Sequence, residues 1–366
     1  MHIVQILPEL NDGGVERGVI DLNRELCKLN YKSTVITKGG KHVDQISNDG
    51  GQIIFFDVSS KNPLSFYLRV FLLKKLLTSL NPDILHARSR IPAWLAWKAN
   101  KKLKIPFITT VHGFNSINRY SSIMTKGDLV IYASHAVNDY VIKNFKINKN
   151  KLRYVPRGVD TEFFNPESVD KEWIENFKEN YQLQKKRIIS IVGRITKWKG
   201  HDDFIHAIAK SQKSDPSIIG LIVGDASSNN KVYFESLKKL TLELGANIIF
   251  VGSQKKMREI YTISNLVVSA SSDKPETFGR TIAESLSMNT PVIASNHGGA
   301  KDIIIDQKNG LLFEPKNKNE LAKLINESKT YLFENMRSHI QKKFSLTIMT
   351  DLETSVYQEA LKLNVK

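Results

Sequence analysis

A glycine-rich segment at residues 12–18, read as Asp-Gly-Gly-Val-Glu-Arg-Gly, follows the apolar run 2–8 and opens a helical pattern. Gly13 and Gly14 let the backbone approach a ligand, and helix N-terminal amides favour an anion. The spacing differs from the GxGxxG fingerprint, which disfavours a dinucleotide. A tight strand-to-helix turn would explain the same glycines.

Two cations flank a second loop, which directly follows the apolar run at 187–193. Gly193 and Arg194 begin this loop, and Lys199 and Gly200 end it. Arginine offers a planar fork to phosphate oxygens, and lysine adds a compact charge. The pair therefore indicates a phosphate-binding loop, with an ordinary charged surface loop as the alternative.

Two carboxylates lie eight residues apart in the third segment, 275–286. Glu276 precedes a predicted helix, and Glu284 lies about two turns into it. A carboxylate before the helix suits sugar hydroxyls, and one within it suits a ribose diol. The amides around Thr277, Phe278 and Gly279 would meet phosphate. The two glutamates are also compatible with charges at the start and on the surface of a helix.

Two histidines, His86 and His112, each end a predicted strand. A histidine in this position is either a ligand contact or a hydrogen-bonded core residue, and the glycine after His112 favours the first role there. The sequence has no Asp-x-Asp motif and no His/Cys cluster with zinc spacing, so no metal site is predicted.

Thirteen apolar runs alternate with helical patterns and must position these segments. Continuous Val/Ile-rich runs separated by helices are typical of parallel sheets buried on both faces. Two such series predict an α/β protein with two facing Rossmann-like, doubly wound domains and a central cleft. The runs are 2–8, 33–37, 52–58, 83–87, 106–111, 129–133 and 152–155, then 187–193, 218–224, 247–252, 266–270, 291–295 and 311–313.

The polar stretch at 166–186 separates the two series and is predicted to be a linker. The domains are then 1–165 and 187–345. Residues 346–366 read as a final helix that packs back on the first domain. A lone cysteine, Cys27, and an N-terminus without a leader pattern predict a cytoplasmic protein.

The whole ordered set of motifs resembles the group-one, family-four retaining glycosyltransferases, which have the GT-B fold. The resemblance runs from the Gly13 loop through His86, His112 and the Val-Pro-Arg-Gly-Val-Asp stretch at 155–160. It continues through Gly193, Lys199 and the Glu276/Glu284 pair to a Gly-Gly turn at 298–299. Two positions depart from the family pattern, with Arg157 in place of a small polar residue and Asp302 in place of glutamate.

The resemblance implies a role for each matching residue in a metal-independent transfer of a hexosyl group. Arg194 and Lys199 would hold the donor diphosphate, while Glu276 binds sugar hydroxyls and Glu284 the ribose. His112 would lie where sugar and acceptor meet. Gly13, Gly14, Gly193, Thr277, Phe278 and Gly279 would line the phosphate site, and Gly252 and Ser253 would contact the base through backbone groups. The donor would be a UDP-, GDP- or ADP-sugar, with no separate cofactor.

The net charge of +16 is unevenly distributed along the chain. Residues 61–104 hold ten basic side chains against one acidic, with several aromatic residues among them. This pattern predicts peripheral contact with an anionic membrane and a glycan or lipid-linked acceptor, as in lipopolysaccharide or other envelope polysaccharide synthesis. A solvated basic face is the alternative. A sugar-nucleotide epimerase on the same fold and a basic nucleic-acid-binding protein also remain open; no nucleic-acid motif supports the latter, so no nucleic-acid partner is predicted.

Overall fold

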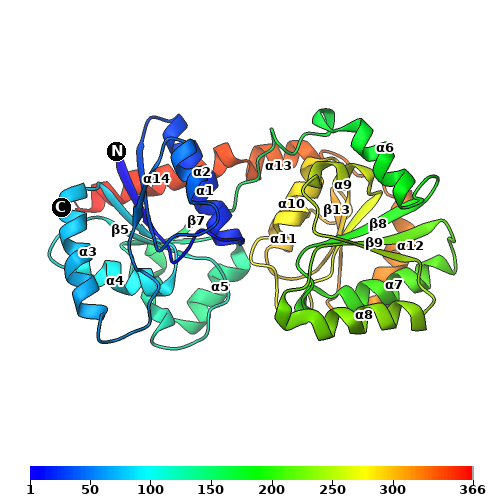
Figure 1. Cartoon of the computed structure of the whole chain (residues 1–366), viewed down its shortest axis with the longest axis horizontal. Helices are drawn as coiled ribbons and strands as arrows, with labels where there is room; N and C mark the ends of the chain where they lie inside the picture. The colour runs from blue at the N-terminus through cyan, green and yellow to red at the C-terminus, as the bar shows by residue number, and fades with distance from the viewer. Residues whose placement is uncertain (365–366) are drawn as a thin grey trace. The chain divides into compact units, whose positions relative to one another are not determined.

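Thirteen parallel strands form one sheet of seven and one of six in the computed structural model, which describes residues 1–364 (Figure 1). Each sheet belongs to its own compact unit. The first unit comprises Met1–Gly158 and the segment from Leu346 onward, and the second comprises Val159–Ser345.

The sheet of the first unit has the strand order β3-β2-β1-β4-β5-β6-β7. Register is set around β1, where Ile3 pairs with Ser33 on one side and Ile84 on the other. β1 is buried along its whole length, as expected for a central parallel strand. The strands are β1 (His2–Ile6), β2 (Lys32–Thr37), β3 (Gln52–Phe55), β4 (Ile84–Ala87), β5 (Phe107–Val111), β6 (Leu129–Tyr132) and β7 (Leu152–Tyr154).

Helices cover both faces of this sheet (Figure 1). One face carries α1 (Gly14–Lys28), α2 (Val43–Asn48) and α14 (Leu346–Asn364). The other carries α3 (Phe66–Leu80), α4 (Arg90–Asn100) and α5 (His135–Asn144). The C-terminal helix α14 joins this unit because Met349, Val356 and Tyr357 are buried with Ile3 and Leu22.

The sheet of the second unit has the order β10-β9-β8-β11-β12-β13. Its strands are β8 (Arg187–Val192), β9 (Ile218–Val223), β10 (Ile248–Gly252), β11 (Leu266–Ser269), β12 (Val292–Ser295) and β13 (Gly310–Phe313). Its helices are α6 (Lys171–Asn180), α7 (His201–Gln212), α8 (Lys231–Glu243), α9 (Met257–Ile263), α10 (Arg280–Ser287), α11 (Ala300–Ile303), α12 (Lys318–Glu327) and α13 (Met336–Phe344).

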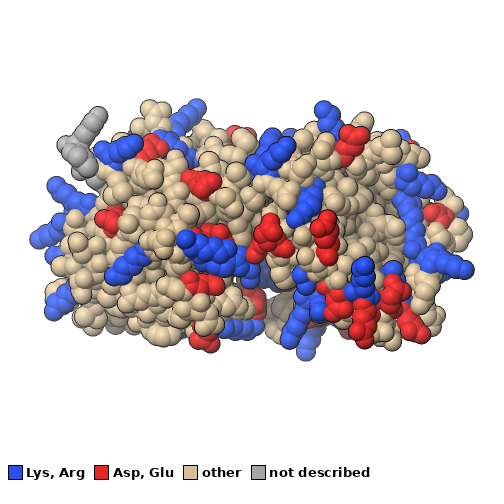
Figure 2. All heavy atoms as spheres, turned by 90° about the horizontal axis from the view of Figure 1, so that it is seen from above, with Lys and Arg blue, Asp and Glu red and all other residues tan. Residues whose placement is uncertain are grey.

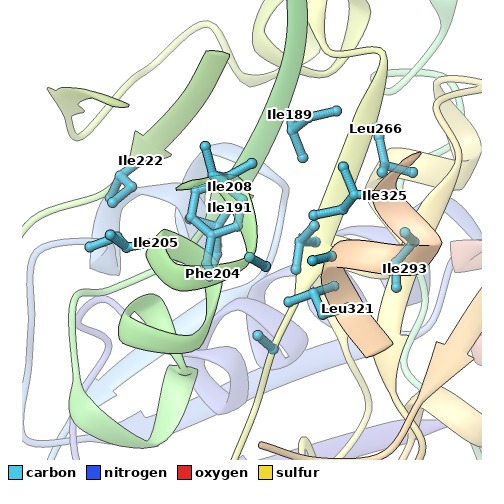
Figure 3. Close-up of a cluster of buried hydrophobic side chains, with 14 of the residues drawn as sticks. Ile189, Ile191, Phe204, Ile205, Ile208, Ile222, Leu266, Ile293, Leu321 and Ile325 are labelled. Carbon is cyan, nitrogen blue, oxygen red and sulfur yellow. The ribbon is translucent and has the colours of Figure 1, made fainter. Parts of the chain in front are cut away.

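An isoleucine-rich core fills the space between this second sheet and helices α7 and α12 (Figure 3). Phe204 and Ile208 come from α7, Leu321 and Ile325 from α12, and Ile191 from β8. All five are at most 2% exposed, so the central strands, and the loops that follow them, rest on a close-packed layer.

Residues 166–186 are not a linker, which corrects the sequence-based prediction. They contain α6, whose Ile174 and Phe177 are buried against Ile188 and Ile260 of the second unit. The polar face of this amphipathic helix dominates the composition of the segment and hides its apolar stripe. The boundary between the units lies at Gly158.

Both sheets have the strand order of a Rossmann fold, which confirms the predicted fold class. In such sheets the carboxyl ends of all strands meet at one edge, and ligands bind where the strand order reverses. That point lies between β1 and β4 in the first sheet and between β8 and β11 in the second. No helix within residues 1–364 is long and apolar enough to cross a membrane.

Candidate functional site

The two loops with the predicted phosphate- and sugar-binding residues follow β8 and β11, the neighbouring strands at the switch point of the second sheet. Their close contact depends on Gly200, which has a φ of +71°. A Cβ there would lie 1.9 Å from the carbonyl oxygen of Ala270, so only glycine fits. The Ser272 amide also donates to the Trp198 carbonyl at 2.8 Å. Packing and a backbone hydrogen bond therefore fix the two loops as one surface.

Lys199 and Glu276 form an ion pair across these loops. Their side chains are 19% and 15% exposed, and the Ser271 hydroxyl also lies 3.4 Å from the same Glu276 oxygen. Trp198 lies under the lysine, with Nζ 4.6 Å from the ring centroid. The predicted phosphate cation and the predicted sugar carboxylate are thus direct neighbours.

Arg194, from the same loop, is exposed and makes no hydrogen bond or ion pair with any of residues 1–364. Gly193, just before it, has a φ of +145°. A Cβ on Gly224 would lie 2.0 Å from the Gly193 carbonyl oxygen, so the turns after β8 and β9 also approach closely. A cationic side chain is thereby presented to solvent from a rigid turn.

Glu284 lies within α10, and its carboxylate is hydrogen-bonded to Tyr261. The tyrosine hydroxyl donates to one Glu284 oxygen at 2.9 Å, and Arg280 Nε lies 3.4 Å from the other. Burial and the neighbouring carboxylate raise the pKa of Tyr261 well above its usual value, so the hydroxyl stays protonated and remains a donor. Glu284 is held in one orientation, with 13% of its side chain exposed.

The segment between the two glutamates is shaped by a Gly-Gly turn beneath it. A Cβ on Gly298 would lie 2.3 Å from the Glu276 carbonyl oxygen, and one on Gly299 would lie 2.4 Å from that of Phe278. The Gly299 amide donates to the Glu276 carbonyl at 2.8 Å. Phe278 is buried in the core, and Gly279 adopts a φ of +104° just before α10. Thr277 therefore lies in a constrained loop at the start of a helix, where the dipole favours an anion.

The predicted base-binding residues lie at the carboxyl end of β10. Gly252 has a φ of +67°, and the Ser253 amide donates to Asp225 Oδ1 at 3.1 Å. The Asp225 carbonyl accepts from the Ile195 amide at 2.9 Å, which ties this corner to the phosphate loop. The amide of Ser253 is thus engaged within the protein.

His112 belongs to the first unit and has a defined protonation state. Its Nδ1 is hydrogen-bonded to the guanidinium of Arg157, which can only donate, so the ring proton is on Nε2. Burial and the Arg157 charge hold the pKa of His112 well below its usual value, which keeps the ring neutral. Arg157 reaches this position because Gly18 has no side chain; a Cβ there would lie 2.3 Å from Nη1.

A cavity of about 170 Å³ adjoins His112 at the switch point of the first sheet. Its lining includes Glu16, Ser89 and Arg90, and Nε2 of His112 is buried without a partner among the described residues. Gly13 and Gly14 begin α1 just before Glu16. The geometry brings a neutral N–H donor, a carboxylate and a cation to one small polar cavity.

His86 is a core residue. Its ring nitrogens lie 2.8 Å from the Tyr357 hydroxyl and 2.7 Å from the Thr110 hydroxyl, and the side chain is fully buried. Arg88, also fully buried, donates to Gln5 and Glu353. This network joins the central strands to α14 and accounts for His86 without a ligand.

Sequence reasoning missed four polar groups that complete the second-unit site. Tyr261 and Asp225 orient Glu284 and Ser253, Ser271 contacts Glu276, and His297 Nε2 lies 2.9 Å from the Ser271 carbonyl. The position of His297, between a strand end and the Gly-Gly turn, was a usable signal. Tyr261 and Asp225 act through contacts 23 and 28 residues distant in sequence, whereas Ser271 lies only five residues before Glu276.

A pH-dependent loss of stability is expected from His201, the first residue of α7. Its side chain is fully buried, and burial together with Lys199 lowers its pKa to about 4. The unfolded chain binds this proton near pH 6.5, so the folded state loses about 1.4 kcal/mol per pH unit as the pH falls from there to about 4. The free energy of unfolding should be measured by denaturant titration between pH 7 and 4 for wild type and for His201→Gln. As the pH falls, wild type should lose stability relative to His201→Gln with this slope. Parallel stability curves would show that His201 titrates normally.

Comparison with known proteins agrees with the fold described above. Residues 12–163 match the family described as Glycosyltransferase Family 4, and residues 173–342 match Glycosyl transferases group 1. A glycosyltransferase structure from Rickettsia africae ESF-5 is 33% identical, covers 99% of this chain and 98% of its own, and superposes with a TM-score of 0.91. The chain belongs to the group 1 glycosyltransferases.

More distant structures share the fold. Anabaena HepE, solved in complex with UDP-glucose, is 19% identical over 98% of this chain and 100% of its own, with a TM-score of 0.82. WaaB, a lipopolysaccharide outer core galactosyltransferase, is 19% identical over 98% and 99% of the two chains, with a TM-score of 0.75. The first curated sequence relatives are 25%, 28% and 22% identical, and the matches span 68%, 56% and 76% of their lengths.

Proposed function

We propose that the protein is a retaining hexosyltransferase that uses a nucleoside-diphosphate sugar, bound at the carboxyl edge of the second sheet. The observation that carries this proposal is the ion pair of Lys199 with Glu276 at the switch point, beside the exposed Arg194. A diphosphate needs cations, and a sugar needs hydrogen-bonding carboxylates next to them. The two loops offer both on one rigid surface.

The bond between the anomeric carbon of the donor sugar and the diphosphate breaks, and the acceptor hydroxyl oxygen bonds to that carbon. Negative charge develops on the leaving diphosphate, which takes up the hydroxyl proton. Lys199 exchanges its partner from Glu276 to a phosphate oxygen, and Arg194 adds a second charge-assisted contact. Glu276, released from the lysine, accepts hydrogen bonds from sugar hydroxyls. Glu284, held by Tyr261, accepts those of the ribose.

In the first unit, the His112 cavity receives a hydroxyl-bearing part of the substrate. Nε2–H of a neutral imidazole donates a hydrogen bond without adding a charge. Arg157 maintains that tautomer. An acceptor hydroxyl or a sugar hydroxyl satisfies this otherwise unpaired buried donor.

Leaving-group stabilisation by cations and the N-terminus of α10 makes the proposed reaction independent of a divalent metal. No group of three or more His, Cys, Asp or Glu side chains within residues 1–364 is arranged to hold a metal ion. In this proposal Arg194, Lys199 and the α10 amides supply the charge stabilisation that Mg²⁺ supplies in metal-dependent transfer.

Nucleotide binding can be tested by thermal shift with UDP, GDP, ADP and CMP in the presence of EDTA. One nucleoside diphosphate should raise the melting temperature, because a ligand that binds only the folded state stabilises it. The shift should be absent in Lys199→Ala and present in Lys197→Ala, a neighbouring exposed lysine. Stabilisation by none of the four, or only after Mg²⁺ is added, would count against the donor site as drawn.

We place the acceptor at an anionic membrane surface on the cytoplasmic side, as a lipid-linked or lipid-anchored glycan of the cell envelope. Support comes from the basic excess in residues 61–104 and from the lipopolysaccharide enzyme WaaB among the structural neighbours. A peripheral contact delivers the acceptor hydroxyl without a membrane-spanning segment.

A further inference from the structure

Helix α3 presents an apolar stripe to solvent. Five side chains at helical spacing are 42% to 90% exposed. They are Leu64, just before the helix, and Tyr67, Leu68, Phe71 and Leu72. Leu73 and Leu77, on the opposite face of the helix, are fully buried in the core of the first unit. The helix is therefore apolar on both faces, and only one is covered by the first unit.

A cavity of about 690 Å³ opens beside the stripe, between the loop before α3 and the helix α4. Apolar rings and an isoleucine form much of its wall: Phe66, Tyr67, Ile91, Trp94 and Tyr120. The volume is within the range of small-molecule sites. It shares no lining residue with the His112 cavity.

The shape of this cavity is built into the fold. Arg69, 6% exposed, donates to the carbonyls of Asp57, Ser60 and Asn62 and so fixes the loop that forms one wall. Trp94 Nε1 donates to the Tyr120 carbonyl at 3.0 Å, which fixes the opposite wall. Arg69 and Trp94 thus direct these N–H groups at backbone carbonyls of the protein. Apolar ring surface is left to line the cavity.

Cations lie at the rim. Lys61 and Lys98 line the cavity, and Lys101 and Lys75 lie over the rings of Trp97 and Phe71 at 4.8 and 4.6 Å. Lys and Arg are spread over the visible faces of both units in Figure 2, with Asp and Glu among them, so overall charge alone marks no patch. What distinguishes this surface is that its lysines lie beside both an exposed apolar stripe and a cavity.

We propose that this surface binds anionic phospholipid, with the α3 stripe in the membrane interface and one hydrocarbon chain of a lipid in the 690 Å³ cavity, its phosphate held by Lys61 and Lys98. The proposal rests on the membrane contact proposed above and names its ligand. Amphipathic helices with basic flanks bind anionic leaflets in this way, and clustered lysines add to the attraction.

A second copy of the chain fits this surface less well. A two-fold contact would place the same patch against itself. The rim lysines would then face their own counterparts, and residues 61–104 supply only Asp83 as an acidic side chain to offset ten basic ones. Repulsion between like charges opposes such a dimer, whereas an anionic lipid surface would neutralise the charges of these lysines.

Sedimentation with vesicles tests the surface. Wild-type protein should bind vesicles of phosphatidylcholine with phosphatidylglycerol at low salt and bind pure phosphatidylcholine weakly. Lys61→Gln/Lys98→Gln should lower the affinity by roughly 20-fold, since each lysine near an anionic surface contributes about fivefold. Lys143→Gln/Lys146→Gln, the same charge change at two exposed lysines outside the patch, should have a much smaller effect.

Fluorescence quenching tests the chain in the cavity. Vesicles with brominated acyl chains should quench wild-type tryptophan emission, and Trp94→Phe should lose most of that quenching. Trp173→Phe, a matched change in α6 of the second unit, should keep it. A nucleoside diphosphate should stabilise all variants equally, which shows that they are folded and separates this inference from the donor site.

Three outcomes would overturn the inference. Vesicle binding without Trp94-dependent quenching would show that no chain enters the cavity. Wild-type protein that ignores anionic vesicles at low salt would remove the lipid surface altogether. Self-association that is lost in Tyr67→Ser/Phe71→Ser, without vesicle binding, would assign the stripe to a second copy.

Discussion

Lys199→Ala should lower the turnover of the nucleotide-sugar donor by two to three orders of magnitude, as the loss of one preorganised electrostatic stabiliser typically does. The effect has two physical sources. The leaving diphosphate loses a cation at the moment its charge develops. The same lysine lies beside Glu276, so without it the negative charges of the carboxylate and the diphosphate repel each other with one cation fewer near them.

Lys197→Ala provides the matched control, because Lys197 lies two residues away in the same short helical turn but is exposed and unpaired with Glu276. The control should keep nearly full turnover in a steady-state assay of nucleoside diphosphate release. Equal losses in both variants would indicate a general effect of loop charge. A Lys199→Ala enzyme with near-normal turnover would remove the lysine from the reaction.

Replacing the two glutamates should separate donor binding from transfer. Glu284→Gln keeps an acceptor for the Tyr261 hydroxyl but removes the charge that binds the ribose, so the affinity for free nucleoside diphosphate should fall about 10- to 100-fold. Glu276→Gln should leave that affinity unchanged or raise it, because a negative charge near the diphosphate is removed. Its turnover should fall by about two orders of magnitude as sugar contacts are lost.

Isothermal titration calorimetry and turnover measured on the same preparations decide the assignment. Glu314→Gln is the control, since this exposed carboxylate follows β13 at the same edge of the sheet. The reverse pattern, with weaker nucleotide binding in Glu276→Gln and normal binding in Glu284→Gln, would exchange the two roles. No change in either variant would place the nucleotide elsewhere.

The strands of the fold could be predicted from the sequence because they are buried on both faces. The Val/Ile-rich runs at 187–193 and 218–224 became β8 and β9 with ends shifted by at most one residue. Central parallel strands have no solvent side, so their sequences carry no competing polar pattern. The prediction of a linker at 166–186 was wrong for the opposite reason. Helix α6 exposes most of its surface, and its buried residues are Ile174 and Phe177.

The sequence predicted which loops form the site, but not which side chains contact one another within it. Strand-end positions place Arg194, Lys199 and Glu276 at one edge by topology alone. The sequence could not show that Lys199 and Glu276 pair, because their contact depends on the close approach of Gly200 to Ala270. The Arg157–His112 pair likewise depends on Gly18, which seemed only part of a glycine-rich turn.

The most direct test of the central claim is a reaction followed by NMR in the presence of EDTA, with the nucleotide sugar identified by thermal shift and an envelope glycan as acceptor. Phosphorus spectra should show release of the nucleoside diphosphate, and proton spectra should show an equal amount of a new glycoside with the anomeric configuration of the donor. Both should disappear in Lys199→Ala. Conversion of the donor to an isomeric nucleotide sugar, with no acceptor consumed, would instead identify an epimerase and contradict the proposed transfer.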